Sequence, residues 1–142
     1  MPYRKNPGGL EVLLITSRGT GRWVIPKGGV KKGFTPAEAA EREAYEEAGI
    51  KGALSPDPLG CFSYNKRLRN GASRPASVEV YAMRVVVELK KWPERAQRRL
   101  KWMSIPHAVK LVDEEGMKVL LLRLEQIEGA AFWILGGGLT LL

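Results

Sequence analysis

The stretch GGVKKGFTPAEAAEREAYEEAGI, residues 28–50, holds the strongest structural signals in this chain. It predicts a helix over residues 35–48. Thr35 is a favourable N-cap, Pro36 suits the first helical position, and Glu38 completes a capping box. Gly49 follows as the residue that ends the helix. Alanines recur at three- and four-residue spacing, which predicts close packing on a sheet: Ala37, Ala40, Ala44 and Ala48.

Three carboxylates gather on one side of this predicted helix. Glu43, Glu46 and Glu47 span about 100° of its circumference. Neighbouring like charges repel, and an exposed helix gains nothing from such crowding. A hard divalent cation such as Mg²⁺ or Mn²⁺ relieves the repulsion, because it prefers oxygen ligands. The residues alone leave two interpretations open: a solvated acidic face and a metal site.

The full spacing resembles the Nudix box. That motif has a glycine, a glutamate after five further residues and, after seven more, the run Arg-Glu-apolar-x-Glu-Glu-x-Gly-apolar. Gly28 is followed at that spacing by the run REAYEEAGI, residues 42–50, and eight of the nine fixed positions match. Phe34 stands where the box has its first glutamate. The flanking strand and the RWVIPKGG segment, residues 22–29, also look like Nudix proteins. The resemblance covers most of the chain.

The resemblance implies a fold and an activity. The expected fold is an α/β/α sandwich with a mixed central sheet, formed by a single domain over residues 1–142. The box spans residues 28–50, and an apolar, glycine-rich tail spans residues 129–142. The expected activity is Mg²⁺-dependent hydrolysis of a phosphoanhydride bond, with Mn²⁺ as a substitute. With this activity, the chain would be a Nudix pyrophosphohydrolase.

The resemblance also assigns roles to residues. The metal would be held by Glu43, Glu46, Glu47 and the carbonyl of Gly28. Glu47 or Glu43 would take the proton from the attacking water, and Arg42 would orient the carboxylates. Phe34 leaves Arg42 without one expected partner, and Glu38, four residues earlier, is the candidate substitute.

Composition limits the remaining possibilities. The chain has 142 residues, 44% hydrophobic and 27% charged, which indicates a soluble globular protein rather than a disordered one. Its one cysteine, Cys61, and one histidine, His107, cannot build a multi-Cys or multi-His metal centre. Cys61 is expected in the core. No apolar segment suggests a signal peptide or a membrane span, so a cytoplasmic location without a membrane partner is expected.

The net charge of +8 suggests a polyanionic ligand. The segments EVLLITSR, residues 11–18, and RWVIP, residues 22–26, look most like the branch that hydrolyses diphosphoinositol polyphosphates and diadenosine polyphosphates. Such a small polyphosphorylated substrate requires many cations, and the expected protein is a monomer or homodimer. The predicted substrate-binding residues are Arg18, Arg22, Lys27, Lys31, Lys32 and Lys66.

Two alternatives remain. The first is a nucleotide pyrophosphatase that acts on ADP-ribose or nucleoside triphosphates. The second is a non-catalytic Nudix module that binds RNA or a nucleotide, which Phe34 and the net charge keep open. The intact set of Glu43, Glu46 and Glu47 argues against the second, because a pure binder has no need of crowded carboxylates. Nucleic acid therefore remains only an alternative partner.

Overall fold

The computed structural model describes residues 1–27 and 32–129. Gly28, Lys31 and the tail after Gly129, which carried predictions, lie outside these ranges. The main sheet has the order β3-β2-β1-β7-β4, with β8 also paired to β2. Its strands are β1 (Pro2–Asn6), β2 (Gly9–Thr16), β3 (Trp23–Val24), β4 (Ile50–Leu54), β7 (Met83–Glu88) and β8 (Leu100–Ser104). Because β1 and β7 are parallel and the other pairs antiparallel, the sheet is mixed, as predicted.

A separate antiparallel hairpin projects from this body. It consists of β5 (Gly60–Arg67) and β6 (Ser73–Val80). The valine-rich run over residues 78–87 predicts one long strand, but in the structure it divides at Tyr81 and Ala82, where the chain leaves the hairpin and enters the main sheet. The run is apolar on both sides of this break, so periodicity gave no sign of it. The prediction that Cys61 is a core residue is wrong: it is exposed on β5, because the hairpin has an open outer face.

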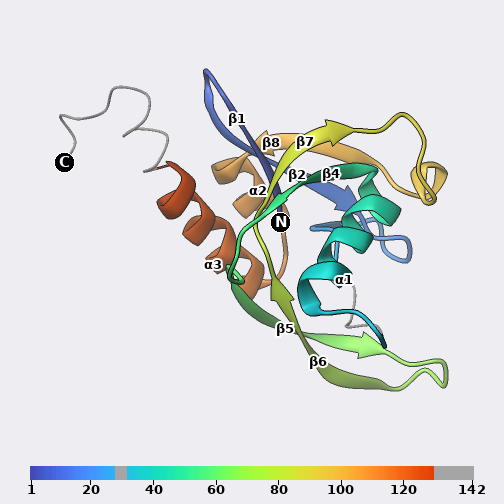
Figure 1. Ribbon diagram of the computed structural model, residues 1–142. Helices are drawn as coiled ribbons and strands as arrows, with labels where there is room; N and C mark the ends of the chain where they lie inside the picture. Colours follow the sequence, from blue (N-terminus) through green and yellow to red (C-terminus); the bar gives the residue numbers. More distant parts are fainter. Residues whose placement is uncertain (28–31, 130–142) are drawn as a thin grey trace.

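Helices cover both faces of the main sheet. The first, α1 (Pro36–Glu43), continues into a π-helical turn, η1 (Ala44–Ala48). The others are α2 (Ile105–Leu111) and α3 (Glu115–Leu124), which runs into a second π-helical turn, η3 (Glu125–Gly129). Figure 1 shows α1 on one side of the sheet and the α2–α3 pair on the other. This arrangement is the predicted α/β/α sandwich.

The core forms where β2 is covered by the α2–α3 pair. Residues 12–15 of β2 are almost completely buried, as are Met117, Leu121 and Leu124 of α3. Burial of this apolar surface fixes β2 at the centre of the sheet and its end, at Thr16, near the start of the site. Within the described residues, no helix is both long and apolar enough to cross a membrane.

Candidate active site

The helix that carries the predicted carboxylates begins and ends as its sequence requires. The amide of Glu38 donates to Thr35 Oγ1 at 3.1 Å, and the amide of Thr35 donates to the Glu38 carboxylate at 3.0 Å. The helix widens into η1 at Ala44 and ends at Gly49, whose φ of 65° is left-handed. Wide π-helical turns of this kind are frequent at functional sites. Here the turn brings the carboxyl groups of Glu43 and Glu47 together.

Glu43 and Glu47 form a buried carboxyl pair, with exposed fractions of 5% and 7%. A hydrogen bond joins their side chains. Burial and this contact raise the pKa of Glu47 to about 8, although Arg98 and the amide of Lys27 favour the charged form. The amide of Lys27 donates to Glu47 Oε1 at 3.2 Å. At neutral pH and without a cation, Glu47 therefore keeps its proton.

Glu46 lies against Arg42 rather than in this pair. The Nε of Arg42 donates to Glu46 Oε1 at 2.9 Å. The guanidinium of Arg42 also lies 5.9 Å from the centre of the Phe34 ring. Glu38, the expected substitute partner, is held in the capping box. Phe34 thus contacts Arg42 through its π face at the position where the box has a carboxylate.

The carboxyl groups suit a divalent cation in their chemistry. Within the described residues, no three His, Cys, Asp or Glu side chains lie close enough together to hold a metal ion as they stand. Glu43 and Glu47 are together, whereas Glu46 is paired with Arg42. Glu47, whose carboxyl lies beside that of Glu43, would release its proton to solvent when Mg²⁺, which takes oxygen ligands, binds the pair. The donor set therefore fits a hard cation.

Beside the pair lies a cleft of about 820 Å³. Segments far apart in the chain form it: the β2–β3 loop, the β5–β6 hairpin, the segment before β8, and the residue before α3. Three of the predicted substrate-binding residues, Arg18, Arg22 and Lys27, line it; Lys32 and Lys66 are exposed elsewhere. The full lining is Ser17, Arg18, Gly19, Arg22, Val24, Lys27, Glu47, Ser63, Tyr64, Asn65, Arg98 and Glu114.

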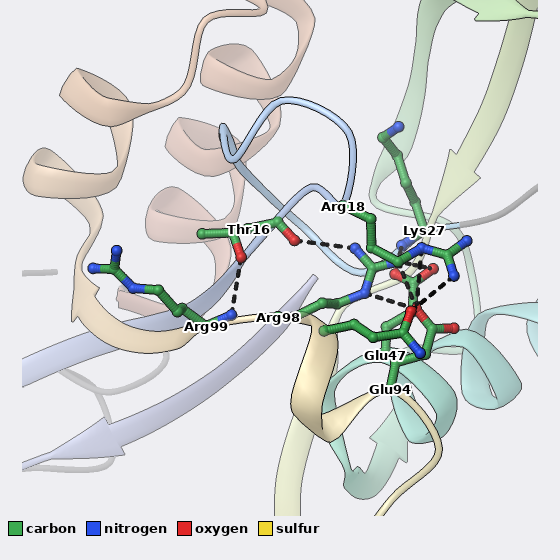
Figure 2. Close-up of polar contacts among 8 residues, drawn as sticks. Thr16, Arg18, Lys27, Glu47, Glu94, Arg98 and Arg99 are labelled. Atoms are coloured by element: carbon green, nitrogen blue, oxygen red, sulfur yellow. Dashed lines mark hydrogen bonds and ion pairs between the residues drawn. The ribbon is translucent and has the colours of Figure 1, made fainter.

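Arg98 is a charged cleft residue that the sequence alone does not distinguish. Only 8% of its side chain is exposed, and it lies 2.8 Å from the carboxylate of Glu94 and 3.5 Å from that of Glu47. It also donates to the carbonyl of Thr16 at 3.1 Å. Figure 2 shows these contacts around Arg98. In the sequence, Arg98 is one cation in a basic run over residues 90–101, and no spacing distinguishes it from its neighbours.

Lys27 lies over the aromatic rings of the hairpin. Its Nζ is 4.1 Å from the centre of the Tyr64 ring and 5.7 Å from that of Phe62. Burial lowers the pKa of the Lys27 ammonium, while Glu114 and Glu47 oppose that shift. Tyr64, which lines the cleft, is thus covered by a cation that belongs to the protein itself.

Comparison with known proteins identifies the family. The NUDIX domain profile matches residues 3–133. The chain belongs to the Nudix family. It is 37% identical over 119 residues to "Nudix hydrolase 12, mitochondrial" of Arabidopsis thaliana, which covers 77% of this chain and 55% of that protein. It is 36% identical over 105 residues to "Diphosphoinositol polyphosphate phosphohydrolase 3-beta" of Homo sapiens, covering 72% and 60%.

A solved structure agrees with the Nudix fold. The C. elegans Ap4A hydrolase in a binary complex superposes with a TM-score of 0.68 at 25% identity, over 91% of this chain and 93% of that one. This Nudix chain spans 55% and 60% of the length of the two curated relatives. Divalent metal ions are generally used in the Nudix family, which agrees with the carboxyl chemistry at Glu43 and Glu47.

Proposed function

We propose that this Nudix chain is a divalent-metal-dependent hydrolase of a phosphoanhydride bond in a polyphosphorylated small molecule. The substrate classes are dinucleoside polyphosphates and diphosphoinositol polyphosphates. One observation carries the proposal: the buried Glu43–Glu47 pair lies at a cleft lined by four cations. These are Arg18, Arg22, Lys27 and Arg98. A pure binding module would gain nothing from two buried acids side by side.

The carboxylates supply the reactive end of the cleft. Glu43, Glu46 and Glu47, with the Gly28 carbonyl, would hold Mg²⁺ or Mn²⁺. When bound, the metal supplies Lewis-acid chemistry to the phosphates and lowers the pKa of a water. Glu47 or Glu43 then accepts the proton of the attacking water as general base. Arg42 acts as a positioning residue through its 2.9 Å contact with Glu46.

The cations supply the binding end. Guanidinium groups bind phosphate oxygens in pairs, and Arg98 is held ready for this by the carboxylate of Glu94. Lys31, Lys32 and Lys66 are proposed as outer contacts. Because Lys27 covers Tyr64, the described lining offers phosphate contacts rather than an open ring for base stacking. This favours polyphosphates over ADP-ribose or an ordinary nucleoside triphosphate. The human and worm relatives, named for their own substrates, support the same choice.

A substrate panel tests the proposal. It contains diadenosine polyphosphates, a diphosphoinositol polyphosphate, ADP-ribose and nucleoside triphosphates, each with Mg²⁺, Mn²⁺ or a chelator. Glu47→Gln and Glu46→Gln should keep the fold, checked by circular dichroism, and lower turnover by roughly 100-fold or more, because each removes a carboxylate ligand. Glu41→Gln, an exposed position on the same helix, is the matched control. Unchanged turnover in both site variants would refute the site.

The same panel decides the non-catalytic alternative. Metal binding without turnover of any substrate, together with nucleic-acid binding that weakens steeply with salt, would favour that alternative.

The proposal also includes a cytoplasmic location and a monomer or homodimer. Three Arabidopsis relatives are named as mitochondrial, so fractionation of cells that express the protein is the test of location. Sedimentation of the purified protein tests the oligomeric state.

A further inference from the structure

Glu114 occupies the position just before α3, where its side chain does nothing for the helix. Its backbone carbonyl accepts the amides of Met117 at 3.1 Å and Lys118 at 3.2 Å, but its carboxylate makes no capping hydrogen bond. Ser, Thr, Asp and Asn are the residues that favour this position, and Glu is not among them. Local helix formation therefore does not explain the choice of glutamate. The side chain lines the substrate cleft instead.

The carboxylate of Glu114 has two cationic neighbours, Arg22 and Lys27, but one of its oxygens lacks a donor. Its Oε1 lies 3.9 Å from Nη1 of Arg22, longer than a hydrogen bond. Its Oε2 is buried and has no hydrogen-bond partner among the residues that the structure describes. Buried polar atoms are nearly always paired in native proteins, so an unpaired acceptor in a ligand cleft calls for a donor from elsewhere. The candidate donors are water, the neighbouring Lys27 ammonium and the substrate.

The chemistry of the substrate decides what that donor is. Phosphate groups at neutral pH offer acceptors and negative charge, so a carboxylate among cations opposes their binding unless it gains a hydrogen bond. The donors nearest to the phosphate chain of such a substrate are its sugar hydroxyl groups, because the amine of an adenine base lies farther away. A ribose next to the phosphate chain has two, whereas a cyclitol with every hydroxyl esterified has none.

We propose that Glu114 accepts a hydrogen bond from a ribose hydroxyl and is a specificity-determining residue. The cleft then selects a nucleoside-bearing polyphosphate, the dinucleoside class, over a fully esterified diphosphoinositol polyphosphate. This inference rests on the proposed function and chooses between its two substrate classes. Recognition through the ribose also agrees with a cleft whose tyrosine ring is covered by Lys27.

The experiment compares kcat/KM for diadenosine tetraphosphate and its 2′,3′-dideoxy analogue. The wild-type chain should prefer the ribose form by about tenfold or more, since a site built to bind a hydroxyl rejects the analogue that lacks it. Glu114→Ala should bring the two values within about twofold of each other. Glu114→Gln should keep part of the preference, because its amide oxygen still accepts a hydrogen bond.

Asp113→Asn is the matched control. Asp113 is the neighbouring acid, 3.7 Å from Nη1 of Arg22, and 65% of its side chain is exposed. The variant removes the same charge beside Arg22 without touching the buried acceptor, so the ribose preference should remain. Inhibition constants of AMP and its 2′,3′-dideoxy form measure the same preference through binding alone. Thermal melting checks that each variant folds.

Two results would overturn the inference: no ribose preference in the wild-type chain, or an unchanged preference in folded Glu114→Ala. A third result would refute the role of Glu114 but leave the proposed hydrolase activity in place. It is efficient turnover of a fully esterified diphosphoinositol polyphosphate, with equal turnover of diadenosine tetraphosphate and its 2′,3′-dideoxy analogue. Absence of turnover for every polyphosphate would instead refute the proposed function. The two failures are thus distinguishable.

Discussion

At the scale of single residues, the environment of Glu47 sets how this protein responds to protons. The side chain is buried beside a second carboxyl, Glu43, and the pKa of Glu47 rises from 4.5 to about 8. In the metal-free protein, this proton stabilises the fold. The contribution is complete below pH 4.5 and is lost as the pH rises through about 8, because the folded pKa lies above the unfolded one.

Metal binding should follow the opposite trend. A cation must displace the proton of Glu47, so Mg²⁺ affinity should rise by about tenfold per pH unit up to the pKa of Glu47 and level off above it. Calorimetric titration of Mg²⁺ from about pH 6 to pH 9, in two buffers of different ionisation enthalpy, measures both the slope and the proton release. A flat profile below the pKa would contradict the prediction. Glu47→Gln should lose most of the slope.

Phe34 shows how one departure from a motif is accommodated. The sequence indicated a lost carboxylate partner for Arg42 and offered Glu38 in its place. The structure keeps Glu38 in the capping box and gives Arg42 two other contacts, the Glu46 carboxylate and the Phe34 ring. An aromatic ring attracts a guanidinium through its quadrupole, without a charge of its own. The departure therefore changes the kind of contact and leaves Arg42 beside Glu46.

At the scale of elements, the turn η1 is held from outside by the segment after β7. The amide of Leu89 donates to the Gly49 carbonyl at 2.8 Å, and that of Glu94 donates to the Glu46 carbonyl at 3.0 Å. The Trp92 ring packs on Gly49 so closely that a Cβ there would lie 2.3 Å from it. The same segment leads to Arg98. One loop thus fixes both the carboxylates and a cation of the cleft.

Gly49→Ala should therefore be costly. The residue has a left-handed φ of 65°, and its Cβ would collide with Trp92. Left-handed strain and overpacking together should lower the free energy of unfolding by about 3 kcal/mol. Gly71→Ala is the matched control: its φ is 84° and nothing lies within 4 Å of a Cβ. Strain alone should cost it about 1 kcal/mol. Urea unfolding measures both, and equal losses would argue against the packing of Trp92 on Gly49.

At the scale of the whole molecule, part of the net charge of +8 is concentrated at the cleft. Arg18, Arg22 and Lys27 belong to one short segment, and Arg98 joins them in the cleft from a distant part of the chain, while Glu94, Asp113 and Glu114 lie beside them. Figure 2 shows Arg18, Lys27 and Arg98 near Glu47 and Glu94. Low-dielectric walls strengthen such a field and attract polyanions.

Substrate capture should accordingly be sensitive to salt. Raising the ionic strength from roughly 20 to 200 mM should lower kcat/KM by about tenfold, because screening acts on the approach of the polyanion. The value of kcat should change little, since the bound substrate excludes most of the solvent. Steady-state kinetics at several salt concentrations provides the measurement, and sucrose of equal osmolarity is the control. A loss confined to kcat would refute steering by the cleft.

Most of the fold was predictable, because its signals are local. Capping at Thr35 and Glu38, the glycine after the helix, and the apolar run of β2 are read from neighbouring residues. The break at Tyr81 and Ala82 was not predictable, since the run is apolar on both sides and only the choice of sheet separates the strands. The exposure of Cys61 was not predictable for a similar reason, because it depends on whether another segment covers that face of the hairpin.

The sequence by itself determined the family, the helix with its carboxylates, and the surplus of basic residues, because motif spacing and charge are written along the chain. Tertiary structure alone decided which residues meet. It buried Glu47 against Glu43, paired Glu46 with Arg42, and brought Arg98 and Glu114 into the cleft. Burial and hydrogen bonding arise between segments far apart in sequence, so no local pattern encodes them.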